Sequence, residues 1–104
     1  TGTQAGLIAY AERVAEASEL PIVLYHRGAA QYTVDSIRRL VRNPRVIGIK
    51  DGVGDVALMQ SFVLAAREAG RDDLLFFNGL LTAEASQAAY SAIGVPRYSS
   101  AVFA

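Results

Sequence analysis

The chain has 104 residues, of which 52% are hydrophobic and 19% charged, a composition typical of one globular domain. Ten basic residues balance ten acidic ones, so net charge gives no reason to expect binding to nucleic acid or to an anionic membrane. The absence of cysteine and the single histidine exclude disulfides, thiolate metal sites and histidine-rich metal sites. We see neither an apolar run of about 20 residues nor a secretory signal, and we expect a cytoplasmic protein.

Helix-like and strand-like segments alternate along the chain. Apolar residues at helical spacing predict a helix over residues 4–19, which Pro21 ends. Thr33, Asp55 and Thr82 are suitable N-cap residues for the helices that follow, and Gly70 is a suitable C-terminal stop. The predicted helices cover residues 4–19, 34–41, 56–69 and 82–93, and the predicted strands cover 22–25, 45–50, 74–77 and part of 95–103, with a polar loop at 26–32.

This order predicts an α/β fold with a parallel sheet covered by helices, because the apolar strands are continuous and separated by helices. The strands recur every ~24–28 residues, as in the (β/α) units of a TIM barrel, and four such units make half of a barrel of ~250 residues. We therefore expect residues 1–104 to form a partial TIM-barrel domain, about helix 4 to strand 8, of a larger chain. The alternative is a complete small doubly wound domain.

The carboxyl ends of parallel strands meet at one edge of a sheet, where ligands bind in α/β proteins. Tyr25, Lys50 and the Asn78–Gly79 pair are predicted to lie at this edge. Lys50 is the one lysine among ten cationic residues, and arginine does not lose its proton in proteins, so Lys50 is the one candidate amine nucleophile. Loss of hydration in a barrel mouth favours the neutral, nucleophilic amine, and a tyrosine hydroxyl nearby can relay protons.

Side-chain alternation predicts which residues face the same way. Val46, Gly48 and Lys50 should share one face of their strand, and Val23 and Tyr25 one face of theirs. If both faces point into a barrel, Gly48 leaves space below the lysine.

Several of these residues have ordinary alternatives. A lysine at a strand end is more often solvated than catalytic, a tyrosine there more often packs at the rim of the core, and His26 and Arg27 more often begin a solvated loop. Ser100 either lines a pocket or is a small barrel residue. A non-enzymatic receiver-like α/β domain is a further alternative, but it needs a phosphate-accepting aspartate at a strand end, where we place Tyr25 and Lys50.

Residues 23–26 and 46–51 resemble the two signature strands of the dihydrodipicolinate synthase and N-acetylneuraminate lyase superfamily. Residues 50–55, 78–84 and 98–103 are similar to one family within it, the 5-dehydro-4-deoxyglucarate dehydratases. The resemblance covers nearly the whole chain. It departs at His26, where members often have asparagine. The family's Thr-Thr pair and the tyrosine lent by a neighbouring subunit belong to a part of the barrel that this chain lacks.

The resemblance implies a role for each candidate residue. Lys50 would form a Schiff base with a 2-oxo acid, 5-dehydro-4-deoxy-D-glucarate, and Tyr25 would relay protons. We expect Arg27, Gly79, Thr82 and Ser100 to bind substrate, with Arg27 clamping a second carboxylate bidentately.

The implied products are 2,5-dioxopentanoate and CO2. The imine is the electron sink, so neither a metal nor an organic cofactor is expected. The resemblance also implies a homo-oligomer, a tetramer. Another class I aldolase or lyase of the dihydrodipicolinate synthase type remains an alternative.

Overall fold

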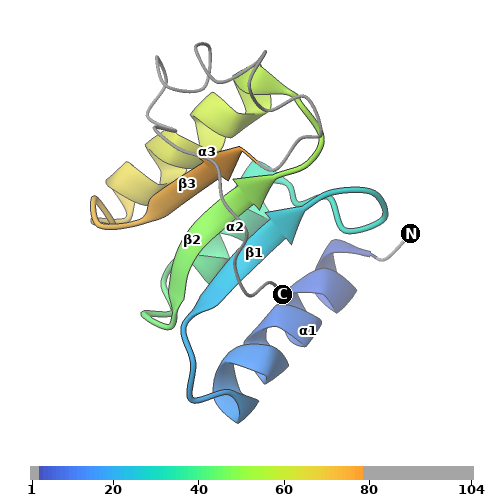
Figure 1. Ribbon diagram of the computed structural model, residues 1–104, viewed down its shortest axis with the longest axis vertical. Helices are drawn as coiled ribbons and strands as arrows, with labels where there is room; N and C mark the ends of the chain where they lie inside the picture. The colour runs from blue at the N-terminus through green and yellow to red at the C-terminus, as the bar shows by residue number, and fades with distance from the viewer. Residues whose placement is uncertain (1–2, 79–104) are drawn as a thin grey trace.

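The computed structural model describes residues 3–78, where three helices alternate with three strands of one parallel sheet (Figure 1). The sheet order is β1-β2-β3, so each strand lies beside the next strand in the chain. The elements are α1 (Gln4–Ala17), β1 (Ile22–His26), α2 (Val34–Leu40), β2 (Val46–Asp51), α3 (Val56–Glu68) and β3 (Leu75–Asn78). The predicted α/β class is confirmed in this part of the chain. The helix predicted at 82–93 and the strand predicted within 95–103 lie outside the described residues.

Side-chain caps begin each helix, as the sequence predicted for two of them. Thr33 Oγ1 accepts the Ser36 amide at the start of α2, and Asp55 Oδ1 accepts the Leu58 amide at the start of α3, 3.0 Å away. These contacts satisfy amide groups that have no partner within the helix. The capping predictions for Thr33 and Asp55 are therefore confirmed.

The helix ends differ slightly from the prediction. α1 ends at Ala17 rather than at residue 19, because Ser18 is already extended and its hydroxyl accepts the Leu20 amide. α3 ends at Glu68 and is followed by Gly70 with φ of +76°. The Gly70 amide donates to the Arg67 carbonyl and the next amide to the Ala66 carbonyl, the Schellman pattern that a positive φ permits.

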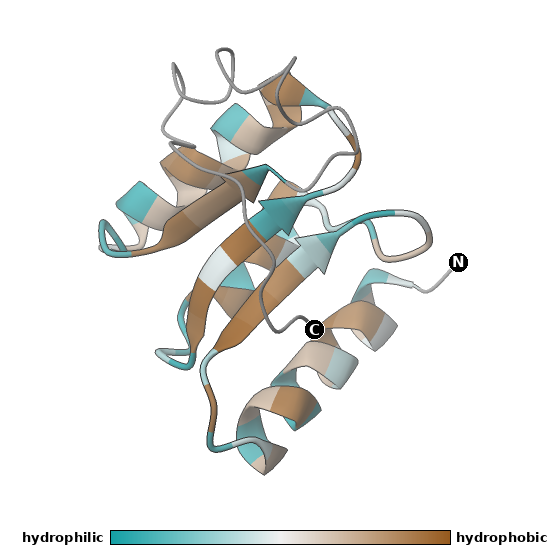
Figure 2. Cartoon of the chain, viewed as in Figure 1, coloured by the Kyte–Doolittle hydropathy of each residue, from teal (hydrophilic) through white to brown (hydrophobic). Residues whose placement is uncertain are grey.

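Each strand extends one residue beyond its predicted end. Tyr25 pairs with Lys50, and the ladder continues to His26 beside Asp51 and to Asn78 on the other side of Asp51. All three terminal residues are buried. In Figure 2 the hydrophobic colour along the strand bodies gives way to hydrophilic colour at their carboxyl ends.

The two faces of the sheet have different environments. One face carries Leu24, Ile49 and Phe76, which pack with residues of the helices in the main hydrophobic core. Figure 1 shows α2 and α3 behind the sheet, on this side. The opposite face carries Tyr25 and Lys50 in adjacent register.

Val46 does not share the face of Lys50, so that prediction was wrong. The register between β1 and β2 shifts after Ile22: Ile22 pairs with Val46, but Val23 pairs with Gly48. Ile47 is the extra residue, which has no register partner on β1. Val46 packs in the core on the helix side of the sheet. An irregularity of this kind breaks the simple alternation of side chains along a strand.

Arg71 joins the amino end of β2 to the segment that follows α2. Its guanidinium donates to the carbonyls of Val41 at 2.6 Å, Asn43 at 3.2 Å and Val46 at 2.7 Å, and it forms an ion pair with Asp73. The Arg71 side chain is only 15% exposed, so these bonds are largely shielded from water. Arg71 therefore has a structural role at the amino end of β2 and is not a candidate for ligand binding.

Candidate functional site

Lys50 and Tyr25 lie side by side at the carboxyl end of the sheet. Lys50 is the residue before the last one of β2, the central strand, and is flanked by Tyr25 on β1 and Phe77 on β3. Its Nζ lies over the Tyr25 ring, 5.1 Å from the centroid, and the lysine is only 8% exposed. The structure therefore brings together the residue predicted as the amine nucleophile and the residue predicted to transfer protons.

Glycine 52 allows the loop after β2 to lie directly against Tyr25. A Cβ atom at this position would lie 2.9 Å from Tyr25 Cε1, 3.0 Å from Arg27 Cβ and 3.4 Å from the Tyr25 hydroxyl. Carbon atoms in contact normally lie about 3.5–4.0 Å apart. The Gly52 amide also donates to the His26 carbonyl at 2.8 Å, which fixes the loop to the end of β1. Gly52 thus helps to set the position of the tyrosine.

Asp51 holds the same loop from the other side of the strand. Its Oδ1 accepts the Val53 amide at 2.9 Å and its Oδ2 accepts the Gly54 amide at 3.0 Å. The residue is only 1% exposed. We did not predict this role, although aspartate side chains commonly bond to the backbone amide two residues further along the chain.

The structure places His26 in the core rather than in a solvated loop. It is the last residue of β1, is 1% exposed, and meets the Phe62 ring edge-on with centroids 5.1 Å apart. Its Nδ1 accepts the Tyr32 amide at 2.9 Å. Tyr32, predicted to lie in a polar loop, is also buried. The alternation of side chains along the strand was the signal that we missed. His26 lies two residues after Leu24 and four after Ile22, so it faces the helix side of the sheet as they do.

Arg27 lies at the rim of the site. Its side chain is exposed, and Cζ lies 5.1 Å from the centroid of the Tyr25 ring. The structure thus places a guanidinium, which can bind a carboxylate through two parallel hydrogen bonds, beside the same tyrosine that lies under Lys50.

Gly48 leaves no open space below Lys50, contrary to the prediction. A Cβ atom there would lie 3.0 Å from the Leu75 carbonyl oxygen and 3.1 Å from Phe77 Cε2. The neighbouring strand therefore fills the volume that the missing side chain leaves. Gly48 serves the close packing of β2 against β3.

The predicted substrate-binding residues Gly79, Thr82 and Ser100 lie outside the described residues, and their roles stay predictions. Within residues 3–78, no group of three or more His, Asp or Glu side chains is placed to hold a metal ion. No helix in this part of the chain is long and apolar enough to cross a membrane.

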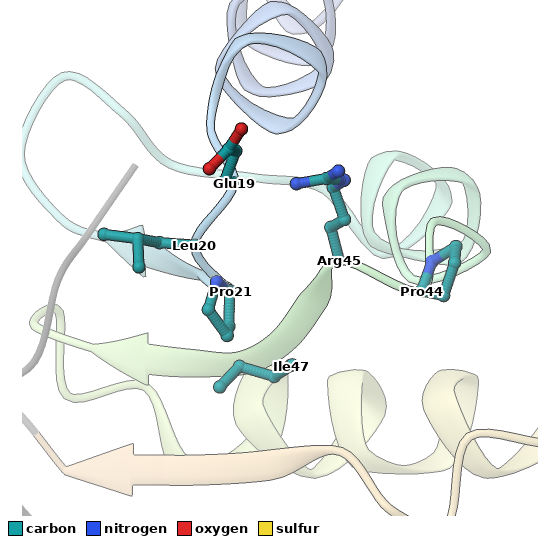
Figure 3. Close-up of a pocket in the computed structure, with 6 residues that line it drawn as sticks. All are labelled: Glu19, Leu20, Pro21, Pro44, Arg45 and Ile47. Atoms are coloured by element: carbon teal, nitrogen blue, oxygen red, sulfur yellow. The ribbon is translucent and has the colours of Figure 1, made fainter.

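A hollow of about 350 Å³ lies at the opposite, amino end of the strands (Figure 3). Its lining consists of Glu19, Leu20, Pro21, Pro44, Arg45 and Ile47. Pro21 directly precedes β1 and Arg45 directly precedes β2, so the hollow is a strand's length from Lys50. It is therefore separate from the Lys50 and Tyr25 site.

Comparison with known proteins identifies the family. The model of the dihydrodipicolinate synthetase family matches residues 1–104. The chain belongs to this family. A probable 5-dehydro-4-deoxyglucarate dehydratase 2 from Streptomyces coelicolor is 54% identical over 101 residues, which are 97% of this chain and 30% of that protein. A 5-dehydro-4-deoxyglucarate dehydratase from Pseudomonas putida is 43% identical over 102 residues, 97% of this chain and 32% of that protein.

Solved structures of the dihydrodipicolinate synthetase family share the fold. Dihydrodipicolinate synthase from Bacillus anthracis matches with a TM-score of 0.79 and 27% identity, over 95% of this chain and 33% of that one. The enzyme from Thermotoga maritima matches with a TM-score of 0.82 and 22% identity, over 96% and 34%, and this likeness shows the fold alone. The prediction of parallel (β/α) units from a TIM barrel is confirmed. The chain spans about a third of the length of the curated relatives it matches.

Family membership also decides against the receiver-like alternative. β2 ends on Asp51 rather than on Lys50, so an aspartate does lie at the end of a central strand. Both carboxylate oxygens of Asp51 accept backbone amides of its own loop, and the residue is 1% exposed. An exposed phosphate acceptor would need the opposite environment.

Proposed function

We propose that the whole protein containing this chain is a Schiff-base-forming dehydratase that acts on 5-dehydro-4-deoxy-D-glucarate. The placement of Lys50 Nζ over the Tyr25 ring at the carboxyl end of the sheet is the observation that carries the proposal. The names of relatives at 54% and 43% identity support the choice of substrate.

The proposed reaction begins at the ketone of the substrate. The Lys50 amine adds to the carbonyl carbon, and loss of water gives a protonated imine. Tyr25, which lies beside the amine, would carry protons between the addition intermediate and the substrate. The cationic imine then acidifies the adjacent CH2 group, and a base removes one of its protons.

Elimination and decarboxylation follow from the same electron sink. The enamine electrons expel the hydroxyl group β to the imine carbon as water, which leaves a conjugated imine. The far carboxylate then departs as CO2, and its bonding electrons move through the conjugated system to the imine nitrogen. The carbon that lost CO2 is then an enol, which tautomerises to the aldehyde by protonation on its neighbouring carbon. Protonation of the remaining enamine on carbon and hydrolysis of the imine release 2,5-dioxopentanoate and restore Lys50. The net change is the loss of one water and one CO2.

Covalent trapping tests the nucleophile. The whole protein would be incubated with pyruvate or with the dicarboxylate substrate and reduced with borohydride, and the adduct would be mapped by peptide mass analysis. We expect the substrate on Lys50 and none in Lys50→Arg, which keeps the positive charge but supplies no neutral amine. An active enzyme with an unmodified Lys50 would refute the imine mechanism.

Product analysis tests the substrate separately. We expect release of CO2 and 2,5-dioxopentanoate in equal amounts from the dicarboxylate. A Lys50 adduct without CO2 release would instead favour the alternative of a class I aldolase or lyase of the dihydrodipicolinate synthase type, the name that the Bacillus anthracis relative carries.

A further inference from the structure

The segment between β1 and α2 carries Arg27 and has little structure of its own to fix it against the sheet. Arg27 and Ala30 exchange two backbone hydrogen bonds of 3.2 and 2.8 Å, and Gly28 between them has φ of +49°. These bonds close a tight turn. They do not determine where the turn lies relative to Tyr25, so other contacts must do so.

Within residues 3–78, the side chains of Gln4 and His26 tie this segment to the neighbouring elements. On the exposed side, Gln4 Nε2 donates to the Gln31 carbonyl at 2.7 Å and Gln4 Oε1 accepts the Thr33 amide at 3.0 Å. On the buried side, His26 Nδ1 accepts the Tyr32 amide at 2.9 Å. His26 is the tie that belongs to the strand of Tyr25, and it joins the beginning of the segment to its end.

The Tyr32 contact fixes the protonation state of the imidazole. A backbone amide can only donate, so Nδ1 must carry a lone pair and the proton of the neutral ring must lie on Nε2. Among the described residues Nε2 has no hydrogen-bond partner. A second proton, on Nδ1, would place two donors, His26 Nδ1–H and the Tyr32 amide, opposite each other, and the hydrogen bond would be lost.

We propose that His26 is a positioning residue, which in its neutral form holds the segment 27–32, and with it Arg27, beside Tyr25. The inference rests on the proposed function, in which Arg27 receives the second carboxylate of the substrate. It adds a residue that acts on the site through Arg27 and does not itself contact the substrate. It also predicts that protonation of His26 at low pH breaks the bond that holds the segment.

The direction of the pH effect follows from the surroundings of the ring. Burial lowers the pKa of His26 below its ordinary value of 6.5, and the carboxylates of Asp51 on β2 and Asp55 at the start of α3 oppose this effect. Tyr32 faces the ring from the segment itself, and Phe62 of α3 brings no charge. With a lowered folded pKa, the bond contributes fully above pH 6.5 and its contribution is lost as the pH falls through the folded pKa.

Two variants separate the hydrogen bond from the bulk of the ring. In His26→Asn, Oδ1 lies as many bonds from the backbone as Nδ1 does, so it can accept the Tyr32 amide but does not titrate. In His26→Gln the acceptor lies one bond farther out, near the place of Nε2. Arg27→Lys is the comparison variant, because it keeps the charge but loses the fork geometry.

Kinetics of the whole protein test the proposal. We expect His26→Gln and Arg27→Lys each to raise KM for the dicarboxylate about tenfold, which corresponds to one hydrogen bond. His26→Gln should trap pyruvate, which has no second carboxylate, at the wild-type rate, and His26→Asn should keep a KM for the dicarboxylate within about threefold of wild type. Wild-type KM should rise below pH 6.5, and this acid limb should be absent in His26→Asn.

Equal KM values for His26→Gln and His26→Asn, or an acid limb that persists in His26→Asn, would overturn the proposal. Hydrogen exchange at the Tyr32 amide gives an answer that needs no substrate: protection should be high in wild type and His26→Asn and lost in His26→Gln. If the wild-type protein released no CO2, the proposed function would fail. The exchange measurement would then still decide whether His26 holds the segment.

Discussion

Replacing Gly52 by alanine tests whether the loop after β2 positions Tyr25. The added Cβ would lie 2.9 Å from Tyr25 Cε1 and 3.0 Å from Arg27 Cβ, against an ordinary contact of about 3.5–4.0 Å. The tyrosine ring, the Arg27 stem or the loop must therefore move by roughly 0.6 Å or more. Since a displacement of about 1 Å can cost ~10²-fold in rate, we expect kcat to fall about 10- to 100-fold.

The assay is steady-state CO2 release by the whole protein. Val53→Ala, in the same loop but exposed, is the matched control and should retain wild-type kcat. Circular dichroism and thermal unfolding would show that the Gly52→Ala variant is folded. A folded Gly52→Ala enzyme with kcat within twofold of wild type would refute the claim that this contact sets the tyrosine's position.

Two further predictions follow from single residues. Tyr25→Phe keeps the ring under Lys50 and removes only the hydroxyl, so kcat should fall ~10²–10⁴-fold without loss of fold, and a loss under threefold would assign Tyr25 to packing. Arg71→Lys can keep about one of the three bonds to the Val41, Asn43 and Val46 carbonyls. The free energy of unfolding should therefore fall by about 2–4 kcal/mol. An unchanged midpoint of thermal unfolding would show that these bonds do not stabilise the amino end of β2.

Local chemistry in the sequence was enough to predict the helices and strands of residues 3–78. Thr33 and Asp55 cap the helices they were expected to cap, because a capping side chain acts within three residues of itself. The strands were found from continuous apolar runs, and the single lysine was visible in the composition alone. Because parallel strands end at one edge of the sheet, the proximity of Lys50 and Tyr25 also followed from the order of the elements.

Only the tertiary structure decided the details that depend on partners far away in the chain. The irregularity after Ile22 moved Val46 to the helix side, since register is fixed by the pairing of two strands and not by either one. Phe77 of β3 fills the space at Gly48 of β2, and Gly52, in the loop after β2, lies against the Tyr25 ring of β1. His26 reads as a loop residue in the sequence but is buried, because its bond to the Tyr32 amide satisfies one ring nitrogen in the core.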